Sequence, residues 1–221
     1  LTFVYMTNWD ALATAAAASR RLNRCLAETR LRDEETNEIA TALDKLADKF
    51  VAGSQRDKLD DMLTRPHLAA IYNGKHTPLD LSPGDEIEFD PFSIAGGIFH
   101  PSSIGLKFFK ESNESVLAVT SVHPMFAGPP ERVHGGIQAL IVDEVMGALN
   151  RMRGRQAFTA YLNVNYRGPA PLNVDLSFRA WVDKIEGRKV FLKATGQESN
   201  KTFMDADGLF IAREDQNPDA N

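Results

Sequence analysis

Cysteine is nearly absent from this chain of 221 residues, which contains a single one, Cys25. One thiol cannot form an intrachain disulfide, so the sequence excludes a small fold held together by disulfides and favours a reducing compartment. Cys25 lies among Leu22 and Leu26 in a segment of helical composition. We therefore expect it to be a buried structural thiol.

Long hydrophobic runs are also missing. No window approaches the roughly 18 consecutive apolar residues that a membrane span requires. Residues 1–6 lack the basic region of a secretory signal, and Leu1 suggests a trimmed start. These observations predict a cytoplasmic protein that does not interact with membranes.

Positive charge is not in excess. The chain has 25 Lys and Arg against 30 Asp and Glu, a formal net charge of -5. Without a global basic field, nucleic acid is not expected as a partner. A phosphorylated ligand is not excluded, because it needs only a local basic cluster. The histidines show no metal-ligand spacing among themselves, so no metal site is predicted.

Three regions differ in composition. Residues 1–65 form a predicted helical extension, because the segment from residue 8 is rich in Ala, Leu, Arg and Glu and has almost no Gly or Pro. Helices are expected over 10–30 and 33–51, as a hairpin that packs on the rest of the chain. A structural or dimer-stabilising role competes with a role as a lid or docking arm. Residues 66–103 are interrupted by Pro and Gly but contain Phe92 and Phe99, which predicts an irregular, packed connector.

The third region, residues 104–215, changes to the alternation typical of strands. Short strands are predicted over 104–110, 115–122, 157–166, 174–185, 190–198 and 203–213. The strand at 157–166 is expected to present Phe158, Ala160, Leu162, Val164 and Tyr166 on one face. A helix from residue 134 to about 152 is apolar nearly all round and should be buried. The simplest packing is an α+β unit, a curved antiparallel sheet wrapped around that helix.

The start of this central helix contains the most informative motif, Val133-His134-Gly135-Gly136, followed by Asp143. Unpaired N–H groups and the positive end of the helix dipole suit a carbonyl that gains negative charge. A carboxylate can attack such a carbonyl or activate water toward it. The pattern predicts acyl transfer to water.

The spacing between Gly135 and Asp143 also constrains how a site can form. Gly135 and Asp143 are eight residues apart, or about 12 Å along a helix axis. One acyl carbonyl cannot contact both. Two such helices lying antiparallel would bring Gly135 of one beside Asp143 of the other, so we expect a homodimer with two shared sites.

Several motifs in this order resemble the hotdog fold, and more narrowly the PaaI-like acyl-CoA thioesterases, over about residues 100–213. These motifs are Gly128-Pro129-Pro130, His134-Gly135-Gly136, Asp143, the run Thr159-Ala160-Tyr161-Leu162-Asn163-Val164-Asn165-Tyr166 and the turn Glu186-Gly187-Arg188-Lys189. The resemblance implies a hotdog domain with an N-terminal helical extension. It also implies an acyl-CoA substrate, no cofactor other than the coenzyme A of that substrate, and a homodimer or a dimer of dimers.

The resemblance also implies catalytic roles. The Gly135 N–H would polarise the thioester carbonyl, Asp143 would come from the neighbouring subunit, and Thr159 would assist the hydrolytic water. Other branches of the family place an asparagine where this chain has Gly128. Thr159 therefore becomes the expected helper.

The remaining candidates have competing interpretations. His134 suits a cap that shapes the loop better than a general base. Gly136 and Glu144 are expected to complete the substrate- and oxyanion-binding group. Because Glu144 lies about 100° round the helix from Asp143, both carboxylates cannot face one site. Glu144 is therefore expected to act at the dimer interface or behind the site.

Four basic residues are candidates for binding the phosphates of coenzyme A: Arg167, Lys184, Arg188 and Lys189. Simple surface charge is the competing interpretation. Two other functions remain open, an enoyl-CoA hydratase on the same fold and a non-catalytic acyl-CoA-binding module. The acyl group is not determined by the sequence.

Overall fold

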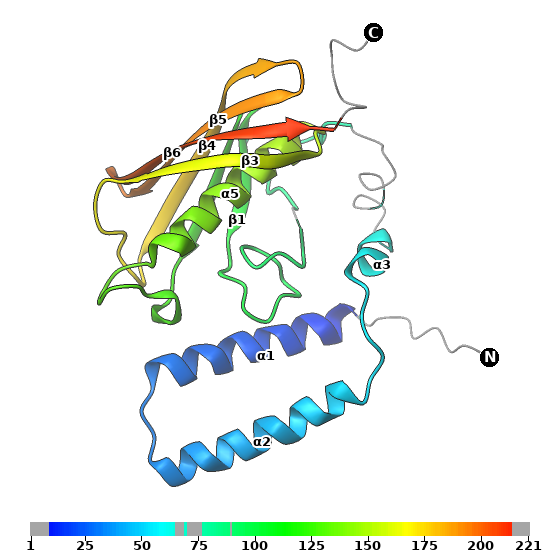
Figure 1. Ribbon diagram of the computed structural model, residues 1–221, viewed down its shortest axis with the longest axis vertical. Helices are drawn as coiled ribbons and strands as arrows, with labels where there is room; N and C mark the ends of the chain where they lie inside the picture. The colour runs from blue at the N-terminus through cyan, green and yellow to red at the C-terminus, as the bar shows by residue number, and fades with distance from the viewer. Residues whose placement is uncertain (1–8, 65–68, 70–76, 89, 214–221) are drawn as a thin grey trace, which may run out of the picture.

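The computed structural model describes residues 9–64, 69, 77–88 and 90–213. Figure 1 shows a curved sheet over one long helix, with a pair of helices beneath. The elements are α1 (Trp9–Glu28), α2 (Asp33–Val51), α3 (Lys58–Leu63), β1 (Lys107–Ser112), β2 (Ser115–Ser121), the 3₁₀ turn η1 (Pro124–Phe126), α5 (Gly135–Met152), β3 (Ala157–Tyr166), β4 (Asp175–Glu186), β5 (Lys189–Glu198) and β6 (Lys201–Ala212).

The six strands form one antiparallel sheet in the order β1-β2-β4-β5-β6-β3. Helix α5 packs against its concave face and buries Ile141, Val142, Val145, Met146 and Leu149 completely. At Gly208 of β6 an added Cβ would lie 3.0 Å from the Met146 sulfur, so the helix approaches the sheet closely there. The predicted α+β hotdog arrangement is confirmed.

The two edges of the sheet differ. The connector covers the β1 edge, because the Ile87 N–H donates to the Phe108 carbonyl (2.8 Å) and the Lys110 N–H donates to the Asp85 carbonyl (3.0 Å). The outer edge of β3 pairs with no strand in the described part of the chain. Exposed edges invite pairing with another chain. The β3 edge is therefore the open one.

A β-bulge divides strand β3. Thr159 pairs with Phe210 and Tyr161 pairs with Leu209, which leaves Ala160 as an extra residue. The extra residue of a bulge shifts the alternation of side chains, so that positions i and i+2 on opposite sides of it no longer share a face. The prediction that Phe158 shares a face with Leu162 is therefore wrong. Phe158 is 63% exposed, while Thr159 turns toward α5.

Helix α1 packs on the connector. The Trp9 ring lies 5.8 Å from Phe92 and 5.0 Å from Phe99, measured between ring centroids. Arg20 donates to the carbonyl oxygens of Ile98 (3.1 Å) and His100 (2.9 Å). The expected packing of the helical hairpin is therefore made by α1.

Cys25 is exposed, which corrects the expectation of a buried thiol. The prediction was based on its apolar neighbours, but one of them, Leu26, is also exposed. The face of α1 that packs is set instead by residues such as Ala16 and Arg20.

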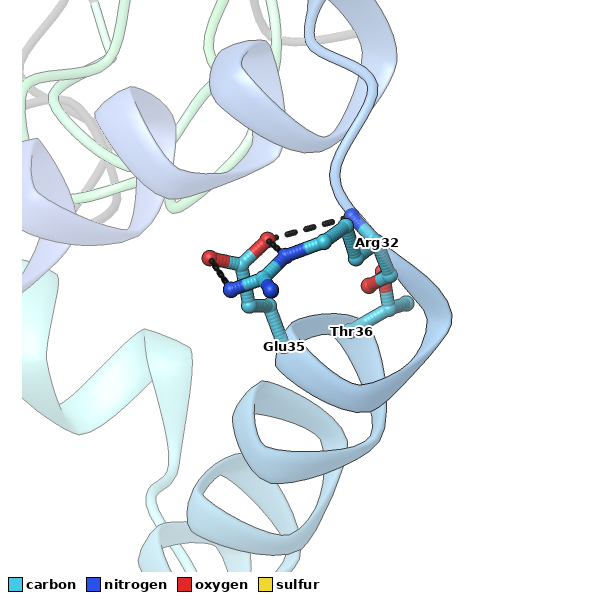
Figure 2. Close-up of polar contacts among 3 residues, drawn as sticks. All are labelled: Arg32, Glu35 and Thr36. Carbon is cyan, nitrogen blue, oxygen red and sulfur yellow. Dashed lines mark hydrogen bonds and ion pairs between the residues drawn. The ribbon is translucent and has the colours of Figure 1, made fainter.

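Helix α2 has no buried residue, and Phe50 near its end is 79% exposed. Its first turn is closed by Arg32 and Glu35 (Figure 2). The Arg32 N–H donates to Glu35 Oε2 (3.1 Å), and the guanidinium donates to both carboxylate oxygens (3.2 and 3.0 Å). The Thr36 hydroxyl donates to the Arg32 carbonyl (3.0 Å). Local contacts thus hold this helix start without burial.

Most of residues 66–76, where the predicted connector begins, lie outside the described residues, as do residues 1–6. The described remainder contributes Ile87 and Ala95 to the same core as α5, and Phe99 is buried as well. This part of the connector is thus packed onto the sheet unit. Among the described helices, none is long and apolar enough to cross a membrane.

Candidate active site

At the N-terminus of α5, one backbone N–H has no hydrogen-bond partner among the described residues. His134 caps the helix, and its Nδ1 accepts the Gly136 N–H (2.9 Å). The N–H groups of Ile137 and Gln138 donate to the His134 carbonyl (3.0 and 3.1 Å). Within the described residues, the Gly135 N–H has no partner. This donor lies at the positive end of the helix dipole, where an oxyanion is stabilised.

The His134 ring forms the N-cap of α5 through its Nδ1. Because Nδ1 accepts a hydrogen bond, the neutral ring carries its proton on Nε2. The His134 N–H also donates to the Phe126 carbonyl (3.0 Å), which ties the preceding loop to the helix. This geometry suits the positioning role expected for His134 and leaves no ring lone pair for a general base.

Tyr166 holds the same helix start, a role that the sequence did not predict for it. Its hydroxyl donates to the Gly135 carbonyl (2.8 Å), and an added Cβ at Gly135 would lie 3.3 Å from the tyrosine ring. The two residues are 31 positions apart, so no linear pattern relates them. A side chain at position 135 would therefore require a small shift of Tyr166.

The other two glycines of the motif region are also closely packed. An added Cβ at Gly136 would lie 3.1 Å from His134 Nδ1, and one at Gly128 would lie 3.0 Å from the His134 Cα. Contacts at 3.0–3.4 Å require the neighbour to shift. An asparagine at position 128 therefore does not fit this loop without rearrangement.

Asp143 and Thr159 form a second pair, two turns along α5. The Thr159 hydroxyl donates to Asp143 Oδ1 (2.7 Å). Asp143 is half-buried, between the fully buried Val142 and the neighbouring Glu144. In the described part of the chain, Asp143 Oδ2 has no hydrogen-bond partner. The carboxylate is thus oriented by Thr159 with one oxygen left to accept a proton.

Glu144 points toward the connector instead. The Ser93 hydroxyl donates to Glu144 Oε1 (3.0 Å), and the same hydroxyl accepts the Ala95 N–H (3.0 Å). Ser93 is buried. Glu144 therefore supports the connector behind the helix, and the structure does not bring it to the face that holds Asp143 and Thr159.

The structure does not bring the four predicted phosphate-binding cations together. Arg167 follows the end of β3 that pairs with Met204, whereas Lys184, Arg188 and Lys189 lie at the β4–β5 turn beside Ile211, at the other end of β6.

Three of these four cations already have partners. Arg167 pairs with Asp205, and its hydrogen bond lowers the pKa of that carboxyl. Lys184 pairs with Glu186 (2.9 Å), and this hydrogen bond raises the pKa of the lysine. Arg188 Nε donates to the Ala212 carbonyl (2.9 Å).

Two half-sites therefore lie along α5, Gly135 with Tyr166 and Asp143 with Thr159. The eight-residue separation corresponds to about 12 Å. Each half carries one part of acyl-transfer chemistry, a donor for an oxyanion or an oriented carboxylate. No single carbonyl reaches both halves in one chain.

The antiparallel sheet wrapped around α5 defines a hotdog domain, and part of this domain matches a known family model. Residues 131–198 match the family model described as Thioesterase superfamily. This segment contains the start of α5 and both members of each half-site. This segment is thus similar to domains of the thioesterase superfamily, and the resemblance to hotdog thioesterases is confirmed.

Two curated relatives are similar over this region. The acyl-coenzyme A thioesterase THEM4 of Bos taurus is 32% identical over 106 residues, covering 47% of this chain and 44% of that protein. THEM4 of Mus musculus is 37% identical over 93 residues, covering 41% and 40%. The similarity thus spans less than half the length of either relative.

One solved structure matches almost the whole chain. The crystal structure of a thioesterase superfamily protein superposes with a TM-score of 0.72 and 22% identity, covering 90% of both chains. At this identity the likeness concerns the fold alone. Because the coverage extends beyond the sheet unit, the shared fold includes much of the N-terminal helical region.

Proposed function

We propose that this protein hydrolyses an acyl-CoA thioester to a free acid and coenzyme A, in active sites shared between two copies of the chain. The observation that carries the proposal is the Gly135 N–H, a first-turn helix donor without a partner among the described residues. The names of the curated relatives, which are acyl-coenzyme A thioesterases, support the same substrate class.

The chemistry divides between the two half-sites. The thioester carbonyl accepts a hydrogen bond from the Gly135 N–H, which stabilises negative charge on that oxygen as the carbonyl is attacked. Asp143 of the partner subunit either takes a proton from the attacking water or adds to the carbonyl itself. The C–S bond then breaks, and the thiolate leaves and is protonated to coenzyme A. When Asp143 itself adds, the resulting anhydride is then hydrolysed by water, which releases the free acid and restores the carboxylate, so both routes end in the same products.

Thr159 acts beside this carboxylate. Its hydroxyl donates to Asp143 Oδ1, which directs Oδ2 toward the substrate. The hydroxyl oxygen also remains able to accept a hydrogen bond from water. Thr159 thus orients both the base and the nucleophile, while His134 holds the Gly135 turn.

The open edge of β3 supplies the expected dimer contact. Strand β3 runs antiparallel to α5, with Tyr166 beside Gly135 and Thr159 beside Asp143. A two-fold axis near Leu162 and Asn163, midway along β3, exchanges these two ends. Pairing two β3 strands about this axis therefore brings Gly135 of one copy toward Asp143 of the partner subunit, as the spacing on α5 requires.

The decisive experiment measures thiol release from a chain-length series of acyl-CoA substrates, with benzoyl- and phenylacetyl-CoA included. Asp143→Ala and Asp143→Asn are expected to lower kcat by about a hundredfold or more while the protein remains dimeric. Glu144→Gln is the matched control, since its carboxylate faces Ser93. The series also identifies the acyl group.

Two results would contradict the proposal. Conversion of crotonyl-CoA without thiol release would indicate an enoyl-CoA hydratase. Binding of every thioester without turnover would indicate a non-catalytic acyl-CoA-binding module.

A further inference from the structure

A basic pocket lies between helix α1 and the sheet domain, outside both half-sites. Its volume is about 270 Å³, and its walls include Arg20, Arg21 and Arg24 of α1 and His123, Met125 and Phe126 around η1. The three arginines are spaced along α1 so that they reach the same pocket. None of these residues was singled out by the sequence motifs.

The charge of this pocket is not neutralised. Among the described residues that line it, there is no carboxylate. Arg24 donates to His123 Nε2 (2.8 Å), and Arg21 is exposed and has no partner in the described part of the chain. Arg20 is anchored on backbone carbonyls, and burial lowers the pKa of its guanidinium. Clustered guanidinium groups without a counter-ion favour a multiply charged anion such as phosphate.

The pocket is close to the oxyanion donor. Phe126 lines it, and the Phe126 carbonyl accepts the His134 N–H at the cap of α5. Gly135 follows directly. A ligand with its carbonyl at Gly135 and a flexible arm can therefore reach the arginines past η1 of the same chain.

We propose that this pocket binds the phosphates at the nucleotide end of the coenzyme A substrate. The inference rests on the proposed function and names the part of the molecule that recognises the phosphorylated end of the thioester. Arg21 and Arg24 supply the charged contacts, and Arg20 holds α1 in place. The N-terminal helix thereby becomes part of the substrate site, whereas the cations of the sheet are mostly paired already.

The test compares Arg21→Gln and Arg24→Gln with Arg30→Gln, which removes the same charge from an exposed residue outside the pocket. Each pocket variant should raise KM for acyl-CoA about tenfold at nearly constant kcat, because one charge-assisted contact is lost. KM for an S-acyl-pantetheine, which lacks the nucleotide phosphates, should not change. Calorimetric titration with coenzyme A, 3′,5′-ADP and inorganic phosphate gives binding without turnover.

Unchanged coenzyme A affinity in Arg21→Gln and Arg24→Gln would overturn the proposal. So would loss of 3′,5′-ADP or phosphate binding in these variants with no change in KM for acyl-CoA, because the pocket would then bind an anion separate from the substrate. If no thioester is hydrolysed, the proposed function fails, and the coenzyme A titrations still decide whether the pocket binds these phosphates. Weaker coenzyme A binding in both pocket variants, but not in Arg30→Gln, supports the assignment.

Discussion

Position 135 allows the role of the backbone N–H to be tested separately from any effect of the side chain. Gly135 is the first residue of α5, where proline fits because no helical hydrogen bond uses that N–H. His134 already has the extended ψ of 135° that a residue before proline adopts. Gly135→Pro thus removes the proposed oxyanion donor with little cost to the helix.

We predict that Gly135→Pro lowers kcat by roughly 10²- to 10³-fold, the usual effect of losing one oxyanion donor. Gly135→Ala is the matched control, because it keeps the N–H and adds the Cβ that contacts Tyr166. Steady-state kinetics on both variants, with circular dichroism to verify folding, makes the comparison. Equal losses in the two variants would attribute the effect to crowding at Tyr166.

Thr159 gives a second prediction at this scale. Thr159→Val removes the hydroxyl that donates to Asp143 and nearly preserves the volume. One charge-assisted hydrogen bond corresponds to a loss of roughly ten- to a hundredfold in kcat. Thr159→Ser retains the donor and should keep most of the activity. Similar kinetics for Val and wild type would remove Thr159 from the mechanism.

At the scale of elements, the exposed edge of strand β3 is the proposed dimer contact. Tyr161 is 41% exposed and lies close to the two-fold axis proposed above. Tyr161→Glu places two like charges near each other in a β3–β3 dimer, so we predict dissociation into monomers and loss of activity together. Sedimentation velocity at several concentrations measures the mass.

Leu46→Glu on α2 is the control for Tyr161→Glu, because it adds the same charge to another exposed apolar position. It should remain dimeric. If Leu46→Glu dissociates and Tyr161→Glu does not, the interface is formed by α2 and the shared-site arrangement across β3 is wrong.

The start of α2 provides a prediction on pH. The hydrogen bond from the Arg32 guanidinium, and then that from the Arg32 N–H, lower the pKa of Glu35 below 4.5. The contact therefore contributes stability that is fully present above 4.5 and is lost as pH falls through the lowered pKa. Glu35→Gln should speed amide exchange in the first turn of α2 at neutral pH, measured by NMR. Glu38→Gln should leave this exchange unchanged. Slow amide exchange in the first turn of Glu35→Gln would contradict the role of the Arg32–Glu35 pair.

At the scale of the whole molecule, shared sites allow two inactive variants to restore each other. A heterodimer of Gly135→Pro and Asp143→Ala chains has one intact site and one doubly altered site. Random mixing after reversible unfolding makes half of the dimers mixed, so activity should recover to about a quarter of wild type. Thiol release from the mixture, compared with each variant refolded alone, measures the recovery. No recovery in a mixture shown to contain heterodimers would place each complete site within one chain.

Much of the fold was predictable because its signals are periodic and local. The helix predicted over 33–51 has these bounds in the structure, and the alternation of 157–166 located β3. The bulge at Ala160 was not predictable, because it depends on how β3 pairs with β6. Exposure of Cys25 depends likewise on which face of α1 meets the connector.

The sequence by itself determined the α+β class, the helix that opens at His134-Gly135-Gly136, and the separation of Gly135 from Asp143 along it. These follow from the side-chain period and the fixed rise of a helix. Only the tertiary structure decided that Thr159 contacts Asp143, that Tyr166 holds Gly135, and that three arginines of α1 share one pocket with η1. Such contacts join residues far apart in the chain, and their geometry is set by how helix, sheet and connector pack together.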